Sequence, residues 1–105
     1  MPSLMLVLPA ELTHVQASAC LEMLLEAARA EAQPQVVIDG AALARFDSSA
    51  LAVLLACRRA CLADRRGFAV RALPPRLREL ARLYGVLGLL PDPPASEQMV
   101  LNAAA

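Results

Sequence analysis

Three short apolar runs, each followed by a helix-like pattern, constrain the fold of this chain most strongly. The runs lie at residues 4–8, 36–38 and 68–73, the second is β-branched throughout, and the third is interrupted by Arg71. Apolar residues recur at helical spacing after each run, and the connections between the segments are short. This order predicts a compact layered α/β domain in which successive strands pair in parallel.

The first half of the chain contains two predicted strands and one predicted helix. Residues 4–8 form the first strand, which Pro9 closes, so one strand is expected before the first helix. Apolar residues then recur every three or four positions over about residues 13–32, which predicts a helix that ends before Pro34. Residues 36–39 are typical of a central parallel strand.

The second half contains two predicted helices and one strand. A helix is predicted from residue 48 or 49 to about residue 66, with Gly67 as its C-terminal stop. Residues 68–73 form the third predicted strand. The prolines at 74–75 open a third helix, because proline is tolerated in the first turn. The buried stripe of this helix is expected to contain Leu77, Leu80, Ala81 and Tyr84.

The length of 105 residues suits a single domain. We assign this domain to residues 1–90, because Pro91, Pro93 and Pro94 cannot continue a helix or pair within a central strand. Residues 91–105 are therefore expected to form a proline-rich tail that either is loose or docks on a partner.

Charge and hydropathy argue against several classes of protein. Ten arginines balance four aspartates and six glutamates, whereas a nucleic-acid binder normally carries a basic excess. Charges interrupt every apolar run well before the roughly 20 residues that cross a bilayer, and residues 4–8 are too short for a signal peptide. Three cysteines on predicted helices argue against disulfides. We therefore expect a cytoplasmic protein with no nucleic-acid partner and no direct membrane insertion.

Side chains that carry catalytic chemistry are sparse. His14 and Cys20 could form a nucleophilic pair, but no third residue that would orient them is evident. A polar histidine at a helix start and a core cysteine are the simpler interpretation. Cys57 and Cys61 lack the further ligands of a tetrahedral zinc site, and no glycine-rich phosphate loop is present. The sequence thus predicts no enzymatic activity, no cofactor and no metal site.

The segment Asp47-Ser48-Ser49, at the start of the second predicted helix, is the remaining candidate site. Aspartate and serine are usual N-cap residues, whose side chains accept hydrogen bonds from the first helical turn. We also expect this turn to offer unpaired N–H donors and the positive end of the helix dipole. Such a turn can receive a phosphate or an acceptor group from a partner.

The helix that follows this segment is apolar around its whole circumference. Four leucines are expected to face the sheet: Leu51, Leu54, Leu55 and Leu62. Three smaller residues are expected to point elsewhere: Val53, Ala56 and Ala60. A small domain has no second core to receive this second group. Exposed apolar surface beside a polar cap therefore predicts a docking face for another protein.

The sequence in this region resembles the STAS domain family, which includes the bacterial anti-sigma-factor antagonists. The resemblance rests on Val-Val-Ile-Asp at residues 36–39 and on Asp-Ser-Ser-Ala-Leu at residues 47–51. The second segment matches the family signature Asp-Ser-Ser-Gly-Leu except at Ala50. Residues 80–86, Leu-Ala-Arg-Leu-Tyr-Gly-Val, look most like the MlaB branch. That branch is the STAS subunit of the Mla phospholipid-transport ATP-binding-cassette complex.

The resemblance implies a small layered domain with a mostly parallel or mixed sheet of three to five strands and helices packed on it. It implies a non-catalytic adaptor that binds and regulates the cytoplasmic ATPase subunit of a Mla-type complex, which serves outer-membrane lipid asymmetry. The protein would then lie at the inner-membrane face through its partner. By position, Ser48 matches the hydroxyl residue at the ATPase contact. The residues expected to bind the partner are Asp47, Ser48, Ser49, Ala50, Val53 and Ala56.

The same resemblance leaves a second function open, that of an anti-sigma-factor antagonist in a partner-switching circuit. Ser49 matches the serine that a kinase-type anti-sigma factor phosphorylates. A phosphate there would add about 1.5 to 2 negative charges, enough to remodel a docking surface. The partner would then be an anti-sigma-factor kinase.

Overall fold

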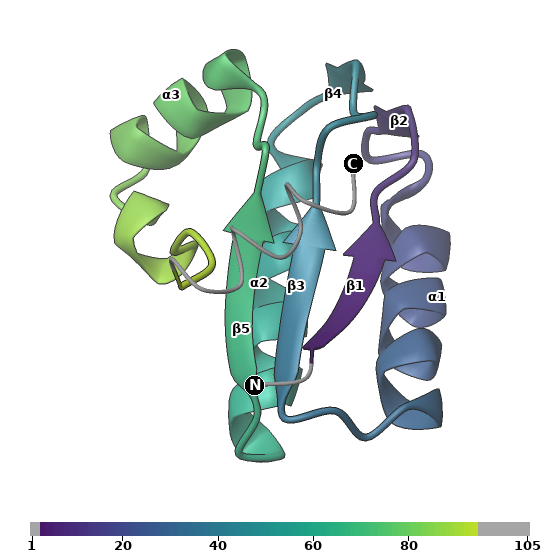
Figure 1. The fold of residues 1–105 in the computed structure, drawn as a ribbon. Helices are drawn as coiled ribbons and strands as arrows, with labels where there is room; N and C mark the ends of the chain where they lie inside the picture. Colours follow the sequence, from purple (N-terminus) through teal and green to yellow (C-terminus); the bar gives the residue numbers. More distant parts are fainter. Residues whose placement is uncertain (1–2, 95–105) are drawn as a thin grey trace.

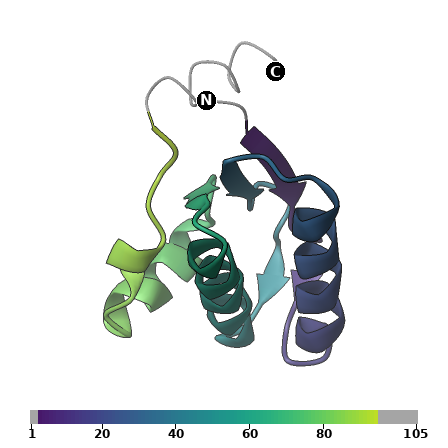
Figure 2. The ribbon, with the colours of Figure 1, turned by 90° about the horizontal axis from the view of Figure 1, so that it is seen from below.

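The computed structural model describes residues 3–94 as an α/β domain (Figure 1). Its central sheet has three parallel strands in the order β1-β3-β5: β1 (Ser3–Val7), β3 (Gln35–Asp39) and β5 (Gly67–Arg71). Two helices lie side by side on one face of this sheet (Figures 1 and 2): α1 (Ala17–Ala30) and α2 (Ser49–Ala63). The predicted alternation of strands and helices, with parallel pairing, is confirmed.

Four further elements complete the described part of the chain: β2 (Glu11–Leu12), β4 (Arg45–Phe46), α3 (Pro75–Leu83) and the 3₁₀ helix η1 (Leu87–Leu89). Strands β2 and β4 form a separate parallel pair, while α3 and η1 lie on the β5 side of the domain (Figures 1 and 2). The expectation of one strand before the first helix is therefore wrong, since β2 also precedes α1. A strand of two residues is too short to show any alternation in the sequence.

The strand register places alternate side chains in rows across the sheet. Two rows belong to the face that the helices cover: Leu4, Val36 and Phe68, then Leu6, Ile38 and Val70. The buried members of these rows form one hydrophobic cluster with residues of α1 and α2. The β-branched run of β3 lies at the centre of the sheet, as expected for a strand that is buried on both faces.

Helix α2 buries a wider surface than the sequence pattern predicted. Its buried residues are Ala50, Leu51, Val53, Leu54, Cys57 and Cys61. The expectation that Val53 points away from the core is wrong, because α1 packs along α2 and Val53 retains only 3% of its surface exposed. Val53 belongs to the same cluster as Cys20 and Leu24 of α1. Leu62, expected to face the sheet, is instead 49% exposed.

The end of α2 also differs from the prediction. Arg65 adopts a positive φ of 57°, its N–H donates to the Leu62 carbonyl, and the N–H of Arg66 donates to the Cys61 carbonyl. This pattern is a Schellman cap with arginine in the position that glycine usually takes. Gly67, predicted as the stop, instead begins β5, where a Cβ atom would clash with the side chain of Gln35.

The first and third helices are each shorter than predicted. A turn closed by the Gln16 N–H and the Thr13 carbonyl precedes α1, so this helix begins at Ala17. Helix α3 buries Leu77 and Ala81, but Tyr84 lies beyond its last residue and is 60% exposed, contrary to the prediction. Among residues 3–94, no helix is long and apolar enough to span a bilayer.

The start of the predicted proline-rich tail contacts the domain. The carbonyl of Pro91 accepts a hydrogen bond of 2.8 Å from the N–H of Val70 in β5, and Pro93 is buried. Leu90, at the predicted domain end, is 3% exposed and joins the hydrophobic cluster. The rest of the predicted tail, residues 95–105, lies outside the described residues.

Candidate functional site

The segment Asp47-Ser48-Ser49 lies at the edge of the sheet where the parallel strands end. Helix α2 returns the chain from this edge to the start of β5, so its N-terminus must lie here. The β2–β4 pair flanks the same edge, beyond the arrowheads of β1 and β3 (Figure 1). In open α/β sheets this is the edge at which binding sites form, because the loops and helix N-termini converge there.

The carboxylate of Asp47 joins two distant parts of the chain. Its Oδ1 accepts a 2.8 Å hydrogen bond from the N–H of Ser49. Its Oδ2 accepts a 3.0 Å bond from the N–H of His14 and lies 3.2 Å from the ring Nδ1 of the same histidine. The backbone N–H groups of His14 and Ser49 stabilise the ionised carboxylate and lower the pKa of Asp47 to about 2. Asp47 is therefore ionised at any physiological pH.

Ser48 occupies the start of α2, but the capping hydrogen bond there comes from Asp47, which leaves the Ser48 hydroxyl unused. Ser48 occupies the N-cap position, yet its side chain makes no capping hydrogen bond. Asp47 provides the side-chain oxygen for the first helical turn instead. Because Ser48 is also exposed, its hydroxyl is available to another molecule.

The expectation of unpaired N–H donors in the first turn is wrong. The N–H of Ser49 bonds the Asp47 carboxylate, that of Ala50 bonds the Asp47 carbonyl at 3.1 Å, and that of Leu51 bonds the Ser48 carbonyl at 3.1 Å. The Asp47 carboxylate and the backbone carbonyls of the turn already accept hydrogen bonds from these three N–H groups. With a negative charge beside them, they do not form a site for a phosphate or another anion.

The six residues predicted to bind a partner do not share one surface. Ser48 is exposed, and three others are half-buried: Asp47, Ser49 and Ala56. The remaining two, Ala50 at 0% and Val53 at 3% exposure, belong to the hydrophobic cluster and cannot touch a partner while the domain is folded. The apolar docking surface is therefore narrower than the sequence pattern predicted.

One strip of α2 remains accessible next to the site. Ser48, Ala52 and Ala56 follow one another at spacings of four residues, which places them on one side of the helix. Ala52 is exposed and was not among the predicted residues, although its small side chain continues the strip beyond Ser48. We call these three residues the α2 strip.

One residue from the loop before α1, His14, contacts the site, and Val15 follows it in the chain. The side chain of His14 is 80% exposed, and Val15 is 73% exposed. His14 reaches Asp47 across 33 residues of sequence. No local pattern signals such a contact, and the sequence around His14 indicates only a polar residue at a helix start.

The described residues give no support to the nucleophilic pair. Cys20 is 5% exposed, and its burial raises the pKa of the thiol, whereas a nucleophilic cysteine needs a lowered pKa. The ring of His14 instead contacts Asp47. Burial, followed by the nearby Cys61 and Cys20, raises the pKa of Cys57 to about 12. Within residues 3–94, no group of histidine, cysteine and carboxylate side chains could hold a metal ion.

Comparison with known proteins identifies the family. The family model described as "Mlab, STAS domain" matches residues 3–91. The anti-sigma factor antagonist SpoIIAA in its unphosphorylated form is 17% identical, with a TM-score of 0.72 over 98% of this chain and 90% of that one. An anti-sigma-factor antagonist (STAS) domain protein from Planctomyces limnophilus is 23% identical, with a TM-score of 0.74 over 96% of this chain and 90% of that one.

No match was found among curated proteins. At 17% and 23% identity, the two solved structures establish the fold alone. The family model covers residues 3–91, which is most of the 105-residue chain and includes every residue of the candidate site. The chain therefore belongs to the STAS domain family, in the group described by its MlaB model.

Proposed function

We propose that this protein is a non-catalytic adaptor that binds the ATPase subunit of a Mla-type phospholipid-transport complex at the cytoplasmic face of the inner membrane. The match to the MlaB family model supports this class of partner. One observation carries the proposal: the hydroxyl of Ser48 is exposed at the helix start and is not used to cap the helix. A serine without a structural role, at the signature position of the family, is suited to contact another protein.

The chemistry of the surface indicates what the partner must present. The small side chains of the α2 strip allow another backbone or helix to approach closely, and the exposed Val15 adds apolar area. At one end of the strip, the Ser48 hydroxyl and the ionised Asp47 carboxylate provide hydrogen-bond acceptors. The ATPase subunit is expected to place donor groups against this end and apolar side chains against Ala52 and Ala56.

Regulation follows from how tightly the adaptor binds each conformation of its partner. A subunit that bound every conformation of the ATPase equally well would change nothing. We therefore expect the adaptor to favour one conformation and so to change the rate of ATP hydrolysis. The adaptor itself contributes no catalytic group to this reaction.

Binding of the purified ATPase subunit to Ser48→Arg tests the contact. Ser48 is exposed, so a long charged side chain fits the fold but obstructs the α2 strip. We expect Kd to rise at least about tenfold. Ala30→Arg adds the same side chain at an exposed position at the far end of α1, and is expected to bind normally. If circular dichroism shows both variants folded and both bind like the unmodified protein, the contact is wrong.

The second candidate function is supported by Ser49. This serine is half-buried, occupies the signature position that antagonists phosphorylate, and donates its N–H to Asp47. A phosphate on Ser49 would lie beside the Asp47 carboxylate, and repulsion between the like charges would rearrange the first turn of α2. Mass spectrometry after incubation with a cognate kinase tests this function. A phosphate on Ser49 supports it, and an unmodified Ser49 rejects it.

A further inference from the structure

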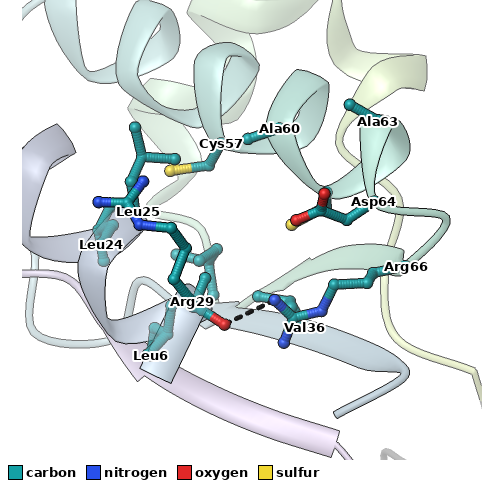
Figure 3. Close-up of a pocket in the computed structure, with 13 residues that line it drawn as sticks. Leu6, Leu24, Leu25, Arg29, Val36, Cys57, Ala60, Ala63, Asp64 and Arg66 are labelled. Atoms are coloured by element: carbon teal, nitrogen blue, oxygen red, sulfur yellow. Dashed lines mark hydrogen bonds between the residues drawn. The ribbon is translucent and has the colours of Figure 1, made fainter. Parts of the chain in front are cut away.

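A second candidate site lies at the opposite end of α2 from Ser48. A cavity of about 290 Å³ opens between α1, α2 and the helix-covered face of the sheet (Figure 3). Its interior is lined by apolar side chains from four elements, among them Leu6, Leu25, Ala28, Ile38, Cys57 and Ala60. At 1.5 Å per helical residue, Ala60 lies about 17 Å along α2 from Ser49 and about 6 Å, or one turn, beyond Ala56 at the end of the α2 strip.

The cavity exists because the facing positions of the two helices carry small side chains. Ala28 of α1 lies opposite Cys57 and Ala60 of α2, where leucine side chains would close the gap. Protein interiors are usually packed without voids larger than a water molecule. The volume here approaches the lower limit of small-molecule sites, about 300 Å³. Such an apolar interior offers water few hydrogen-bond partners, so it is better suited to hydrocarbon.

Charged side chains surround the opening of this apolar interior. Arg66 is fixed there, since its guanidinium donates to the backbone carbonyls of Ala28, Glu31 and Gln33 at 2.7, 2.7 and 2.8 Å. The dashed line in Figure 3 marks its bond to Ala28. Arg29 extends from α1, while Asp64 follows α2 on the other side of the cavity (Figure 3).

Arg29 remains available to a ligand. Within residues 3–94 its side chain forms no hydrogen bond and no ion pair, and it is exposed at the opening. Asp64 is also without an ion-pair partner there, so the opening carries two cations and one anion. The guanidinium of Arg29 has no partner within residues 3–94, although Glu22 and Glu26 line the neighbouring hollow on α1, so an anionic head group would pair with Arg29 itself.

We infer that this cavity binds a small amphiphilic carboxylate of the size of a medium-chain fatty acid. Its hydrocarbon chain would occupy the apolar interior, where burial of apolar surface provides most of the binding free energy. Its carboxylate would remain at the opening and pair with Arg29. The inference stands independently of the proposed function, because the cavity lining and the α2 strip share no residue.

Titration of the purified protein with three eight-carbon probes tests the inference. Octanoate, octanol and octylamine share one chain and differ in the head group, and binding is followed by calorimetry and by the amide NMR shifts of residues lining the cavity. We expect octanoate to bind most tightly and to shift Ala28, Ala60 and Cys61. If octylamine binds best, Asp64 selects the head group and the inference is wrong. Absence of binding by all three probes also overturns it.

Substitutions that fill the cavity provide a second test, for which the chain offers a matched control. Ala60→Leu and, independently, Ala28→Leu are expected to raise Kd for octanoate at least about tenfold, because the added side chain occupies the space of the ligand. Ala30→Leu adds the same bulk at an exposed position outside the cavity and is expected to change nothing. Unchanged octanoate binding by both filled variants, with folding verified by circular dichroism, would overturn the inference.

Two further variants distinguish the contribution of the ligand's head group from that of its hydrocarbon chain, and binding in the cavity from binding of the ATPase subunit. Arg29→Gln is expected to raise Kd about threefold for octanoate and not for octanol, since the pair is exposed. An equal effect on both probes would contradict a role for the guanidinium charge. Ser48→Arg is expected to bind octanoate normally, and Ala60→Leu is expected to bind the ATPase subunit normally. A negative result for octanoate binding therefore does not count against the ATPase contact, and the reverse also holds.

Discussion

Replacement of Arg66 by methionine is expected to lower the free energy of unfolding by about 2 to 3 kcal/mol. The guanidinium donates hydrogen bonds to three carbonyls at and just beyond the end of α1, those of Ala28, Glu31 and Gln33. It therefore fastens the end of α1 to the chain that enters β5. Methionine retains most of the apolar stem of the side chain and removes all three donors.

The expected loss in the free energy of unfolding depends on how exposed each of the three hydrogen bonds is. The bonds to Ala28 and Gln33 are partly buried, and the bond to Glu31 is exposed. A bond from a charged donor contributes about 1.5 to 3 kcal/mol, but water can replace an exposed one at little loss. About 1 to 1.5 kcal/mol for each of the two partly buried bonds gives the total. For a domain of this size, Tm should fall by roughly 10 to 20 °C.

Urea unfolding followed by circular dichroism measures this loss. The neighbouring Arg65→Met serves as the control, because Arg65 is exposed and its side chain makes no hydrogen bond within residues 3–94. This control is expected to change stability by less than about 0.5 kcal/mol. If Arg66→Met is no less stable than Arg65→Met, the three bonds do not hold α1 in place and the reasoning is refuted.

Three further substitutions probe the end of α2, its buried flank and its capping carboxylate. Arg65→Gly is expected to stabilise the domain by about 0.5 to 1 kcal/mol, because glycine adopts the positive φ of 57° without strain; a lower Tm in calorimetry would contradict this. Val53→Ala is expected to lower the free energy of unfolding in urea by about 2 kcal/mol, since Val53 is 3% exposed. A loss below about 0.5 kcal/mol would mean that the Val53 side of α2 is not packed against the core. The pKa of Asp47 falls from 3.8 to about 2 on folding, so its contribution to stability is complete above about pH 5 and is lost as the pH falls toward 2. On acidification from about pH 5 to 2, Asp47→Asn should therefore lose less stability than the unmodified protein, and equal losses would contradict the lowered pKa of Asp47.

The order of the main elements could be predicted because each carries its own local pattern. The β-branched residues of β3 and the helical spacing in α1 are visible within short windows of sequence. The β2–β4 pair could not be predicted, because a two-residue strand shows no periodicity and its partner is distant. The end of α2 was misplaced because Gly67 resembles a helix stop, whereas Arg65 adopts the positive φ.

The candidate site was predictable only in part, for the same physical reason. Aspartate and serine before an apolar run indicate a helix start locally, so residues 47–49 could be identified. The contact of Asp47 with His14 depends on how the fold brings two loops together. A helical wheel likewise does not show which flank of α2 receives α1, and this is why Val53 was assigned to the wrong surface.

Hydrogen–deuterium exchange with and without a Mla-type ATPase subunit reports directly on the proposed contact. We expect slower exchange in the complex at residues 14–15 and 48–56, which form the exposed edge and include the α2 strip. Residues 59–66, at the far end of α2, should exchange at an unchanged rate. Protection at residues 59–66 with none at 48–56, or a complex with no change at either, would contradict the proposed contact.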